Sequence, residues 1–395
     1  MRIHTALFLI LAVPAAAETL SQDIAQNGLA ATEARLAALA TPSDADRFAL
    51  GGVQFLRAIE GTFQERWAMG LTDRSGMLPF LRLPLADNPN PAPFDPAAIV
   101  TLFAHAEAKL SMAQATLASI PATSDLSMDI ALDDIWFDVN SNSTRDAGEG
   151  IGEILGATLG ASPDGATPHP LPVIRFDVAD AAWTGAYADL LAGFCDLVRA
   201  YDPTEPLTRV LTARSAMESI GPVTPDPFLG GMGRPDGIDL LAAVLATLNQ
   251  IPDSPMMTQA HDHFLRMIAQ NREFWARVAT ESDNDREWLP NDQQKSALGI
   301  DVPQGTGVVW QAVLGDLDAV LKGEKLVPYW RVGAPGGINV ARIFSDPRPI
   351  DLAGWFQGWA ALPYLEQGPL LDSAARDAFD QLTQGQAPLF ALYLN

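Results

Sequence analysis

The sequence predicts a mainly α-helical protein, built as an irregular array of helical hairpins with long loops and one small β-strand pair. Three observations lead to this fold class. Apolar residues recur at helical spacing through most of the chain, Pro- and Gly-rich stretches separate these segments, and strand-like alternation occurs in two short runs. The sequence contains no fixed-period repeat and no heptad seam, which argues against a regular solenoid.

The first residues have the features of a secretory signal peptide, which we expect to cover residues 1–17. Met1–His4 carries one fixed positive charge, an apolar run follows from Thr5 to Val13, and small residues stand at Ala15 and Ala17. The apolar run is too short to cross a bilayer. We therefore expect cleavage after Ala17, a periplasmic or secreted location, and no stable membrane anchor after cleavage.

The composition limits the classes of partner. The 395 residues include 48 acidic and 25 basic side chains, which give a formal net charge of -23. Such a charge repels nucleic acid and attracts cations, so we expect no nucleic-acid partner. The single cysteine, Cys195, has no partner for an internal disulfide and lies in an apolar helical stretch, where we expect a buried, unreactive thiol.

Residues 18–121 predict an N-terminal helical region. Helical spacing extends from Leu20 to about Ala40, and it resumes after the capping residue Ser43 and continues to Leu71. The prolines of residues 72–96 remove backbone donors and prevent a continuous helix. A third helix is expected from Asp95 to about Ile120, because an aspartate followed by proline is typical of a helix start.

Residues 122–202 have a different pattern. Alternation over Met128–Leu132 predicts a short strand that leads into the loop described below, and helical spacing returns at Ile151–Leu159. A second short strand is expected at Leu171–Asp177, where it would pair with the first. A long helix then covers Ala181–Tyr201.

Residues 203–395 predict a C-terminal helical region with Gly- and Pro-rich connections. We expect helices at Leu207–Ile220, Gly237–Gln250, Ser254–Thr280, Gly307–Leu321, Leu352–Leu362 and Asp372–Leu382. No sharp change in composition separates the three regions, so they are compatible with one domain.

The most specific motif is a twelve-residue window from Asp138 to Glu149. Its first, third, fifth, ninth and twelfth positions all carry side-chain oxygens, which is the ligand spacing of a calcium loop. Ca²⁺ takes six to eight oxygens, so a tightly wound loop closed by a glutamate can fill most of its coordination shell. The predicted ligands are Asp138, Asn140, Asn142, the carbonyl of Thr144, Asp146 and Glu149.

This window resembles the loop and following helix of an EF-hand, and more specifically the dockerin-like arrangement. The resemblance covers about twenty residues and implies a Ca²⁺ ion rather than a family function. Two positions depart from the EF-hand pattern: Ser143 replaces the usual glycine at the sixth position, and Arg145 stands at the eighth, which is usually apolar. Ser143 implies backbone strain of about 1 kcal/mol. Arg145 implies an unpaired, partly exposed loop, and an ordinary solvated turn is the alternative interpretation.

Other candidate residues give less specific patterns. Glu281–Glu287 gathers four carboxylates in seven residues, but a distant closing ligand is missing, which favours a solvated acidic segment over a second ion site. His261 and His263 stand two apart on a predicted helix and therefore face different directions. His105 and Glu107 share that spacing, and we expect ordinary histidines at all three positions.

From the sequence we favour a periplasmic, non-catalytic binding or scaffolding protein with a structural Ca²⁺ site. The ligand would be an unidentified protein or small molecule. The alternative is a periplasmic hydrolase in which carboxylates such as Asp283, Asp285 and Glu287 perform acid–base or metal-assisted chemistry. The sequence has no Gly-x-Ser-x-Gly or His-Glu-x-x-His motif that would favour this alternative directly.

Overall fold

A computed structural model describes the chain over the following residues: 19–71, 83, 85–155, 170–224 and 237–394. Within these ranges the chain forms thirteen α-helices and two small antiparallel sheets. The predicted mainly helical class is therefore confirmed. The predicted signal peptide lies outside the described residues.

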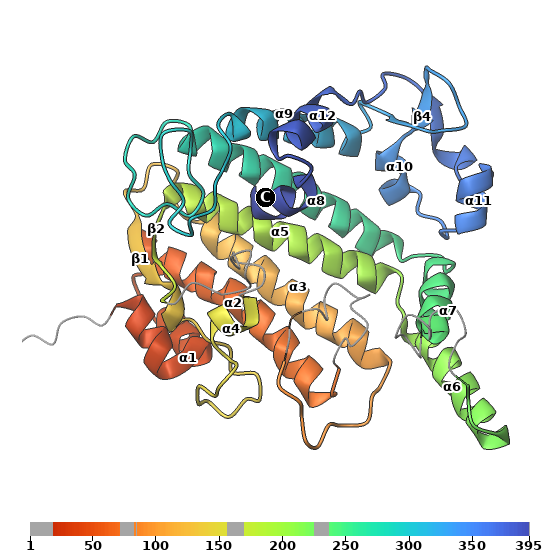
Figure 1. The fold of residues 1–395 in the computed structure, drawn as a ribbon, viewed down its shortest axis with the longest axis horizontal. Helices are drawn as coiled ribbons and strands as arrows, with labels where there is room; N and C mark the ends of the chain where they lie inside the picture. The colour runs from red at the N-terminus through yellow and green to blue at the C-terminus, as the bar shows by residue number, and fades with distance from the viewer. Residues whose placement is uncertain (1–18, 72–82, 84, 156–169, 225–236, 395) are drawn as a thin grey trace, which may run out of the picture.

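Four long helices form the centre of the molecule. They are α2 (Asp44–Ala68), α3 (Ala97–Ala118), α5 (Val178–Ala200) and α8 (Ser254–Val278), and each packs along the next in the order α2, α3, α5, α8 (Figure 1). Small residues on α5 allow close approach, since a Cβ atom at Gly193 would lie 2.7 Å from the ring of Phe264 on α8. All three regions expected from the sequence contribute helices to this layer.

Helix α1 (Leu20–Ala37) is broken at Gly28, which has a left-handed φ of 76°. Close to this break, the indole Nε1 of the buried Trp136 donates to the Ile24 carbonyl at 2.8 Å. A Cβ atom at position 28 would lie 2.9 Å from the Trp136 ring. Glycine is therefore required here both for the backbone angle and for the space occupied by Trp136.

The two predicted strands pair as expected. β1 (Ser127–Ala131) runs antiparallel to β2 (Val173–Asp177), with the buried Ile130 opposite Ile174. β1 ends earlier than predicted, and the 3₁₀ turn η2 (Leu132–Asp134) follows it. Pro172 stands opposite Leu132, and its carbonyl accepts the Leu132 N–H at 3.3 Å, but it has no N–H to return the bond. The strand pairing therefore stops here, and the Asp133 carboxylate accepts the Leu171 N–H at 2.9 Å.

Along the chain, a helix follows each strand of this pair: α4 (Ile151–Leu155) comes after β1 and α5 comes after β2. α4 begins where helical spacing was predicted, and the rest of the expected segment to Leu159 lies outside the described residues. α5 starts three residues before the predicted Ala181, because the Asp177 carboxylate caps its first turn by accepting the Ala179 N–H at 2.7 Å.

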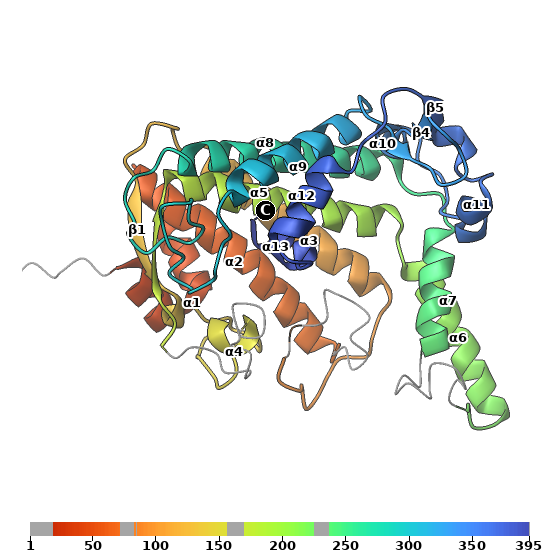
Figure 2. The same cartoon turned by 45° about the horizontal axis from the view of Figure 1, so that its top comes forward.

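The C-terminal part covers one end and one face of the helix layer. Helices α6 (Thr204–Ile220) and α7 (Gly237–Leu248) project from the body, whereas α9 (Thr306–Leu321) packs on α8 (Figures 1 and 2). The shorter elements are β3 (Val327–Pro328), β4 (Gly336–Ile338), α10 (Val340–Ser345), α11 (Leu352–Gln357), η4 (Leu362–Tyr364), β5 (Leu365–Gln367), α12 (Ala374–Leu382) and α13 (Ala387–Leu394).

Some of these C-terminal elements differ from the prediction. α11 stops at Gln357 rather than Leu362, because Gly358 takes a φ of 125° that ends the helix. The short elements α10 and α13 were not predicted. α13 is fixed at the protein centre by its Leu394 carbonyl, which accepts the Asn271 Nδ2 donor of α8 at 3.0 Å.

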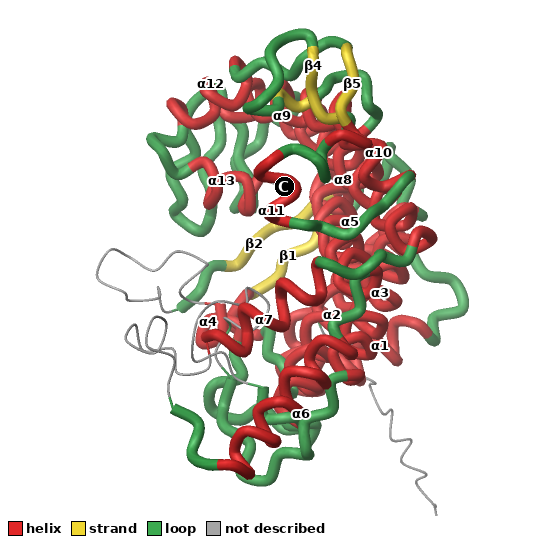
Figure 3. Tube along the Cα trace, turned by 90° about the vertical axis from the view of Figure 1, so that its right-hand side faces the viewer, coloured by secondary structure: helices red, strands yellow, loops and turns green. Residues whose placement is uncertain are grey.

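Seen from the side, the helices α8, α5, α3, α2 and α1 follow one another from top to bottom (Figure 3). In the described part of the chain, none of the helices combines the length and the apolar character needed to cross a bilayer.

Replacing Gly28 by alanine is expected to destabilise the protein by about 1–3 kcal/mol, because the new methyl group demands both a strained backbone and a shift of Trp136. The measurement is the free energy of unfolding in urea. Gly315→Ala on α9 is the matched control: a Cβ atom there meets nothing within 4 Å, so this variant should gain up to about 1 kcal/mol of helix stability. Equal effects of the two substitutions would contradict the role given to Gly28.

Candidate functional site

The base of the predicted calcium loop is closed by backbone pairing. The Phe137 N–H donates to the Glu149 carbonyl at 2.9 Å, the Ile151 N–H donates to the Ile135 carbonyl at 3.0 Å, and Trp136 pairs with Gly150 as an antiparallel bridge. The two ends of the window are thus held side by side. The residues between these two ends, 138–148, therefore form a closed loop, which we call the ring.

Side chains in the first half of the loop hold its backbone. The two oxygens of Asp138 accept the N–H groups of Asn142 and Ser143, both at 2.9 Å. Asn140 Oδ1 accepts the Asn142 N–H at 3.0 Å, and Asn142 Oδ1 accepts the Thr144 N–H at 2.7 Å. These are Asx-type turns, in which short polar side chains wind the chain tightly.

The sixth loop position adopts the backbone angle for which EF-hands use glycine. Ser143 has a φ of 60°, and Ser141 has the same value. A non-glycine residue in this left-handed region costs about 1 kcal/mol, so the loop holds two local strains against its hydrogen bonds. The strain expected at Ser143 is confirmed, and the second strained position was not predicted.

Three predicted ligand side chains converge. Asn140 Nδ2 and Asn142 Nδ2 both donate to the same oxygen of Asp146, Oδ2, each at 2.8 Å. The third, fifth and ninth positions of the loop are therefore brought to one point. Thr144 takes part through its backbone N–H rather than through a contact of its carbonyl.

Glu149, the expected closing ligand, is buried with 4% of its surface exposed. Its Oε1 accepts the Val139 N–H at 2.9 Å, and its Oε2 accepts the Asp146 N–H at 2.8 Å. Burial raises the pKa of this carboxyl above its ordinary value, and the nearby carboxylates Asp146 and Asp138 raise it further. Within the described ranges, no three or more His, Cys, Asp or Glu side chains are placed together to hold a metal ion.

Arg145 lies outside the ring. Its guanidinium donates to the Asp133 carbonyl at 3.1 Å, and residues 141–148 are all exposed, which confirms the prediction of an exposed loop. The window contains three carboxylates and this one cation. The window as a whole is therefore anionic.

The loop is connected to helix α2 by polar groups that sequence reasoning missed. Gln64 Nε2 donates to the Asp138 carbonyl at 2.8 Å. One turn earlier, Glu60 is 1% exposed, and burial raises its pKa to about 7 although it forms an ion pair with Arg57. In the sequence, Glu60 stands at helical spacing among the apolar residues Leu56, Ile59 and Phe63. That pattern could have indicated a buried glutamate.

The acidic segment Glu281–Glu287 is bound to the strand pair. Arg175 of β2 forms ion pairs with Asp283, at 3.7 Å, and with Asp285. Burial is the main cause that raises the pKa of Glu281 to about 7, and the Asp177 carboxylate adds to it. The sequence predicted a solvated segment, and Asp283 and Asp285 are indeed exposed, whereas Glu281 and Glu287 are half-buried.

His105, His261 and His263 each contact a polar group of the protein. His263 is buried, with Nδ1 2.6 Å from Asp189 Oδ1, and its Nε2 is 3.7 Å from Asp196 Oδ2. His261 Nε2 lies 2.8 Å from the Leu321 carbonyl, so the two rings face different neighbours, as helical spacing predicts. His105 Nδ1 lies 2.7 Å from Glu65 on α2.

Cys195 is buried, as predicted. Burial raises the pKa of its thiol to about 12, with Asp196 and Glu107 adding to the effect, so the thiolate needed for nucleophilic chemistry is disfavoured.

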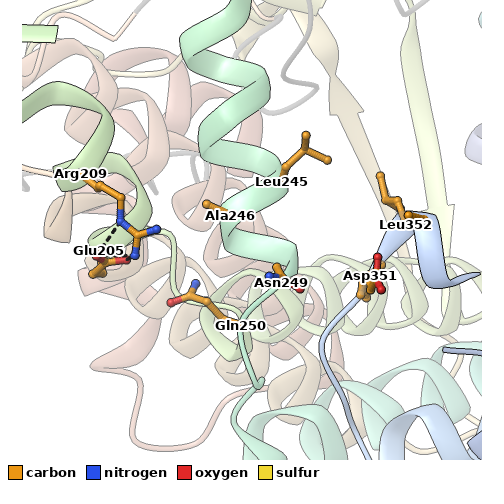
Figure 4. A pocket seen from close by; sticks show the side chains of 10 residues that line it. Glu205, Arg209, Leu245, Ala246, Asn249, Gln250, Asp351 and Leu352 are labelled. Carbon is orange, nitrogen blue, oxygen red and sulfur yellow. Dashed lines mark hydrogen bonds and ion pairs between the residues drawn. The ribbon is translucent and has the colours of Figure 1, made fainter. Parts of the chain in front are cut away.

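A separate, open depression of about 630 Å³ lies between α6, α7 and the start of α11 (Figure 4). The Glu205–Arg209 ion pair stands on one side of it, and Asp351 and Leu352 stand on the other. Both charges of that ion pair are largely exposed and already neutralise each other. This depression therefore offers less to a ligand than the loop does.

No protein-family model, curated protein or solved structure matches the chain.

The raised pKa of Glu281 predicts a pH dependence of stability. The folded protein holds this proton up to about pH 7, whereas the unfolded chain releases it near 4.5. The stabilisation is present below pH 4.5 and is lost as the pH rises to about 7, by an amount on the order of 1–3 kcal/mol after allowance for solvent screening.

Glu281→Gln keeps an acceptor for the Gln294 side chain, which donates to it at 3.2 Å, but removes the titration. Urea unfolding at pH 5 and pH 8 should therefore show a smaller loss of stability in this variant than in the wild type. Glu324→Gln, at an exposed position, is the control and should retain the wild-type difference. A wild-type pH difference in Glu281→Gln would contradict the assignment.

Proposed function

We propose that the protein is a non-catalytic binding protein in which a Ca²⁺ ion bound by residues 138–149 stabilises one end of the helical layer. The observation that carries the calcium part is the convergence of Asn140, Asn142 and Asp146 within a ring closed at its base. A hard divalent cation prefers carboxylate and amide oxygens. Asp146 offers such an oxygen, and Asn140 and Asn142 would have to turn their amide oxygens toward the ion in place of the Nδ2 groups that now contact Asp146. The expected export signal fits this proposal, because calcium is abundant outside the cytoplasm.

In the proposed site, Asp138, Asn140, Asn142 and Asp146 provide side-chain oxygens, Thr144 its carbonyl, and Glu149 the closing carboxylate. The ion would supply positive charge where three carboxylates now repel one another. Asp138 and Glu149 already hold backbone N–H groups of the loop, so the ring is wound before an ion enters. A pre-wound ring reduces the entropy cost of binding.

Structural rather than catalytic use of the ion is supported by where the loop is attached. Gln64 links it to α2, and Trp136 at its base is inserted in the break of α1. An ion here would hold two helices and the strand pair in place. The loop would then do what a disulfide does in many exported proteins, in a chain whose one cysteine is buried.

The hydrolase alternative draws its support from Glu281, whose pKa of about 7 suits a general acid. We favour the binding function because Arg175 neutralises Asp283 and Asp285, two of the carboxylates that the alternative requires. These ion pairs occupy carboxylate oxygens that would otherwise be open to a substrate or a metal ion.

Calcium is expected to stabilise the native state. For a loop with a dissociation constant of about 10⁻⁴ M, 10 mM Ca²⁺ should add about 2.7 kcal/mol and raise the unfolding midpoint by a few degrees. The measurement is thermal unfolding of the mature chain in Ca²⁺, in chelator and in Mg²⁺. An unchanged midpoint in Ca²⁺ would exclude a functional calcium site.

The matched pair of variants is Glu149→Gln and Glu153→Gln. Glu149 is the closing ligand, whereas Glu153 bonds the N–H groups of Gly148 and Gly150 from outside the ring, at 3.1 and 3.0 Å. Glu149→Gln should lose the calcium response and Glu153→Gln should keep it. Unfolding midpoints in chelator report any loss of stability that is independent of the ion.

A further inference from the structure

The exposed large hydrophobic side chains of the described residues are concentrated at one end of the molecule. Fifteen of the 21 lie in two stretches, residues 211–251 and 330–362, and both stretches are far from β1 (Figure 1). Such a concentration is typical of an interaction surface. The second stretch also exposes aromatic rings, and we call its members the aromatic tip: Trp330 (67% exposed), Leu352 (52%), Phe356 (73%), Trp359 (54%) and Leu362 (66%).

The aromatic tip has a packed support. Leu352 and Phe356 stand four residues apart on α11 and therefore share one face of that helix. Trp355 points the other way, and its ring stacks on that of the buried Tyr364, 5.7 Å away. The ring of Trp330, which follows β3, lies 5.3 Å from that of Phe356. The exposed rings are thus presented by fixed elements, so little ordering is needed when a partner binds.

The polar groups beside the aromatic tip already have partners. Trp359 Nε1 donates to Asp351 Oδ2 at 2.9 Å, and Asp351 Oδ1 accepts the Gly354 N–H at 3.0 Å. Gln357 Oε1 accepts the Trp359 N–H at 3.2 Å. A sugar site needs free polar side chains for the hydroxyl groups of its ligand, in addition to an aromatic face. The contacts of Asp351 and Gln357 therefore argue against a carbohydrate.

Arg331 supplies a cation next to the rings. Its guanidinium lies over the Trp330 ring, 5.5 Å from the ring centroid, and donates to the Gln357 carbonyl. The neighbouring Arg342 and Arg348 form ion pairs with carboxylates, whereas Arg331 is in none of the ion pairs among the described residues. A guanidinium without a carboxylate partner is suited to a phosphate group.

The local charge also fits a phosphate-bearing surface. Residues 327–362 carry three basic and two acidic side chains, in a chain of net charge -23. At physiological ionic strength, charges further away than about 8 Å are largely screened. The acidic remainder of the chain therefore repels a phosphate less at the aromatic tip than elsewhere. Indole rings beside an arginine are typical of protein surfaces at the headgroup level of a bilayer.

We propose that the aromatic tip docks reversibly on the surface of a phospholipid bilayer, with its three aromatic rings among the headgroups and Arg331 on a lipid phosphate. This contact is interfacial, and it needs no helix that crosses the bilayer. The proposal goes beyond the binding function above and does not depend on the calcium loop.

The first experiment tests the apolar contact. The mature chain is sedimented with vesicles of phosphatidylethanolamine and phosphatidylglycerol, in chelator so that calcium cannot bridge acidic groups to the lipid. Phe356→Ser should weaken vesicle binding by about tenfold, because one large apolar side chain is lost from the contact.

Val308→Ser on α9 is the matched control, because Val308 is similarly exposed, at 77%, but lies outside the aromatic tip. Its vesicle affinity should stay within about twofold of the wild type. Failure of the wild type to bind the vesicles, or equal effects of the two substitutions, would overturn the proposal.

The second experiment tests the phosphate contact with the same vesicles. Arg331→Gln should weaken binding by about fivefold, since one basic side chain near a bilayer surface contributes about 1 kcal/mol. Arg376→Gln on α12 removes an equal charge from a side chain that is 79% exposed, and it should change the affinity by less than about twofold. Equal losses in both variants would assign the effect to net charge and would contradict a specific contact of Arg331.

The third experiment locates the rings. Phosphatidylcholine with brominated acyl chains, added to the vesicles, quenches the fluorescence of indoles that touch it. The wild type should be quenched, whereas the double variant Trp330→Phe, Trp359→Phe should still bind and lose most of the quenching. Quenching that persists would place other tryptophans in the lipid and would overturn the assignment of the aromatic tip. The thermal midpoint of the double variant shows whether it remains folded.

A second copy of the chain is the other occupant that the experiments distinguish. Two chains of net charge -23 repel each other, so we expect a monomer in sedimentation velocity without lipid. A dimer that Phe356→Ser dissociates would identify a second copy as the occupant and would overturn the bilayer proposal. Because these measurements are made in chelator, their failure leaves the calcium proposal standing.

Discussion

The backbone pairing of residues 135–137 with residues 149–151 is the constraint on which this end of the molecule depends. It forces the exposed residues 141–148 into a ring, so that side chains that are distant in an extended chain meet at Asp146. It also positions Trp136, whose indole fills the break in α1. A loop with loose ends would lose both the ring and the anchor, because neither Asx turns nor one buried tryptophan can fix a long segment alone.

The helix layer has to accommodate buried charged side chains between closely packed helices. Small residues let α5 approach α8, and the same interface holds Asp189 with His263 at 2.6 Å and with the Gln270 amide at 2.6 Å. Each buried carboxylate thereby has a donor, as burial of a charge requires. An apolar cavity of about 330 Å³, between α2, α5 and the β1–β2 pair, is the exception to this close packing.

Local patterns in the sequence predicted what depends on local chemistry. Helical spacing predicted the long helices and alternation predicted the β1–β2 pair, whereas the set of Ca²⁺ ligands inferred from the oxygen spacing stays a prediction. Predicted boundaries were wrong where a single residue decides them, as at Pro172, Asp177 and Gly358. The cavity was beyond prediction because its walls come from five helices, both strands and the segment at Trp288. No sequence window contains enough of these residues to show that they surround one space.

The proposed calcium loop and the apolar cavity share a wall. Ile135 and Ile151, whose backbones pair at the base of the loop, both line the cavity, and Ile24, whose carbonyl holds the Trp136 indole, lines it too. Burial is the main cause that raises the pKa of Glu149, and the nearby charges of Asp146 and Asp138 raise it further, so the three carboxylates disfavour one another across the ring. A cation that removes this repulsion stabilises the paired backbone and with it the positions of both isoleucines. An ion at the surface would thus determine the shape of a cavity that it does not touch, through one short stretch of paired chain.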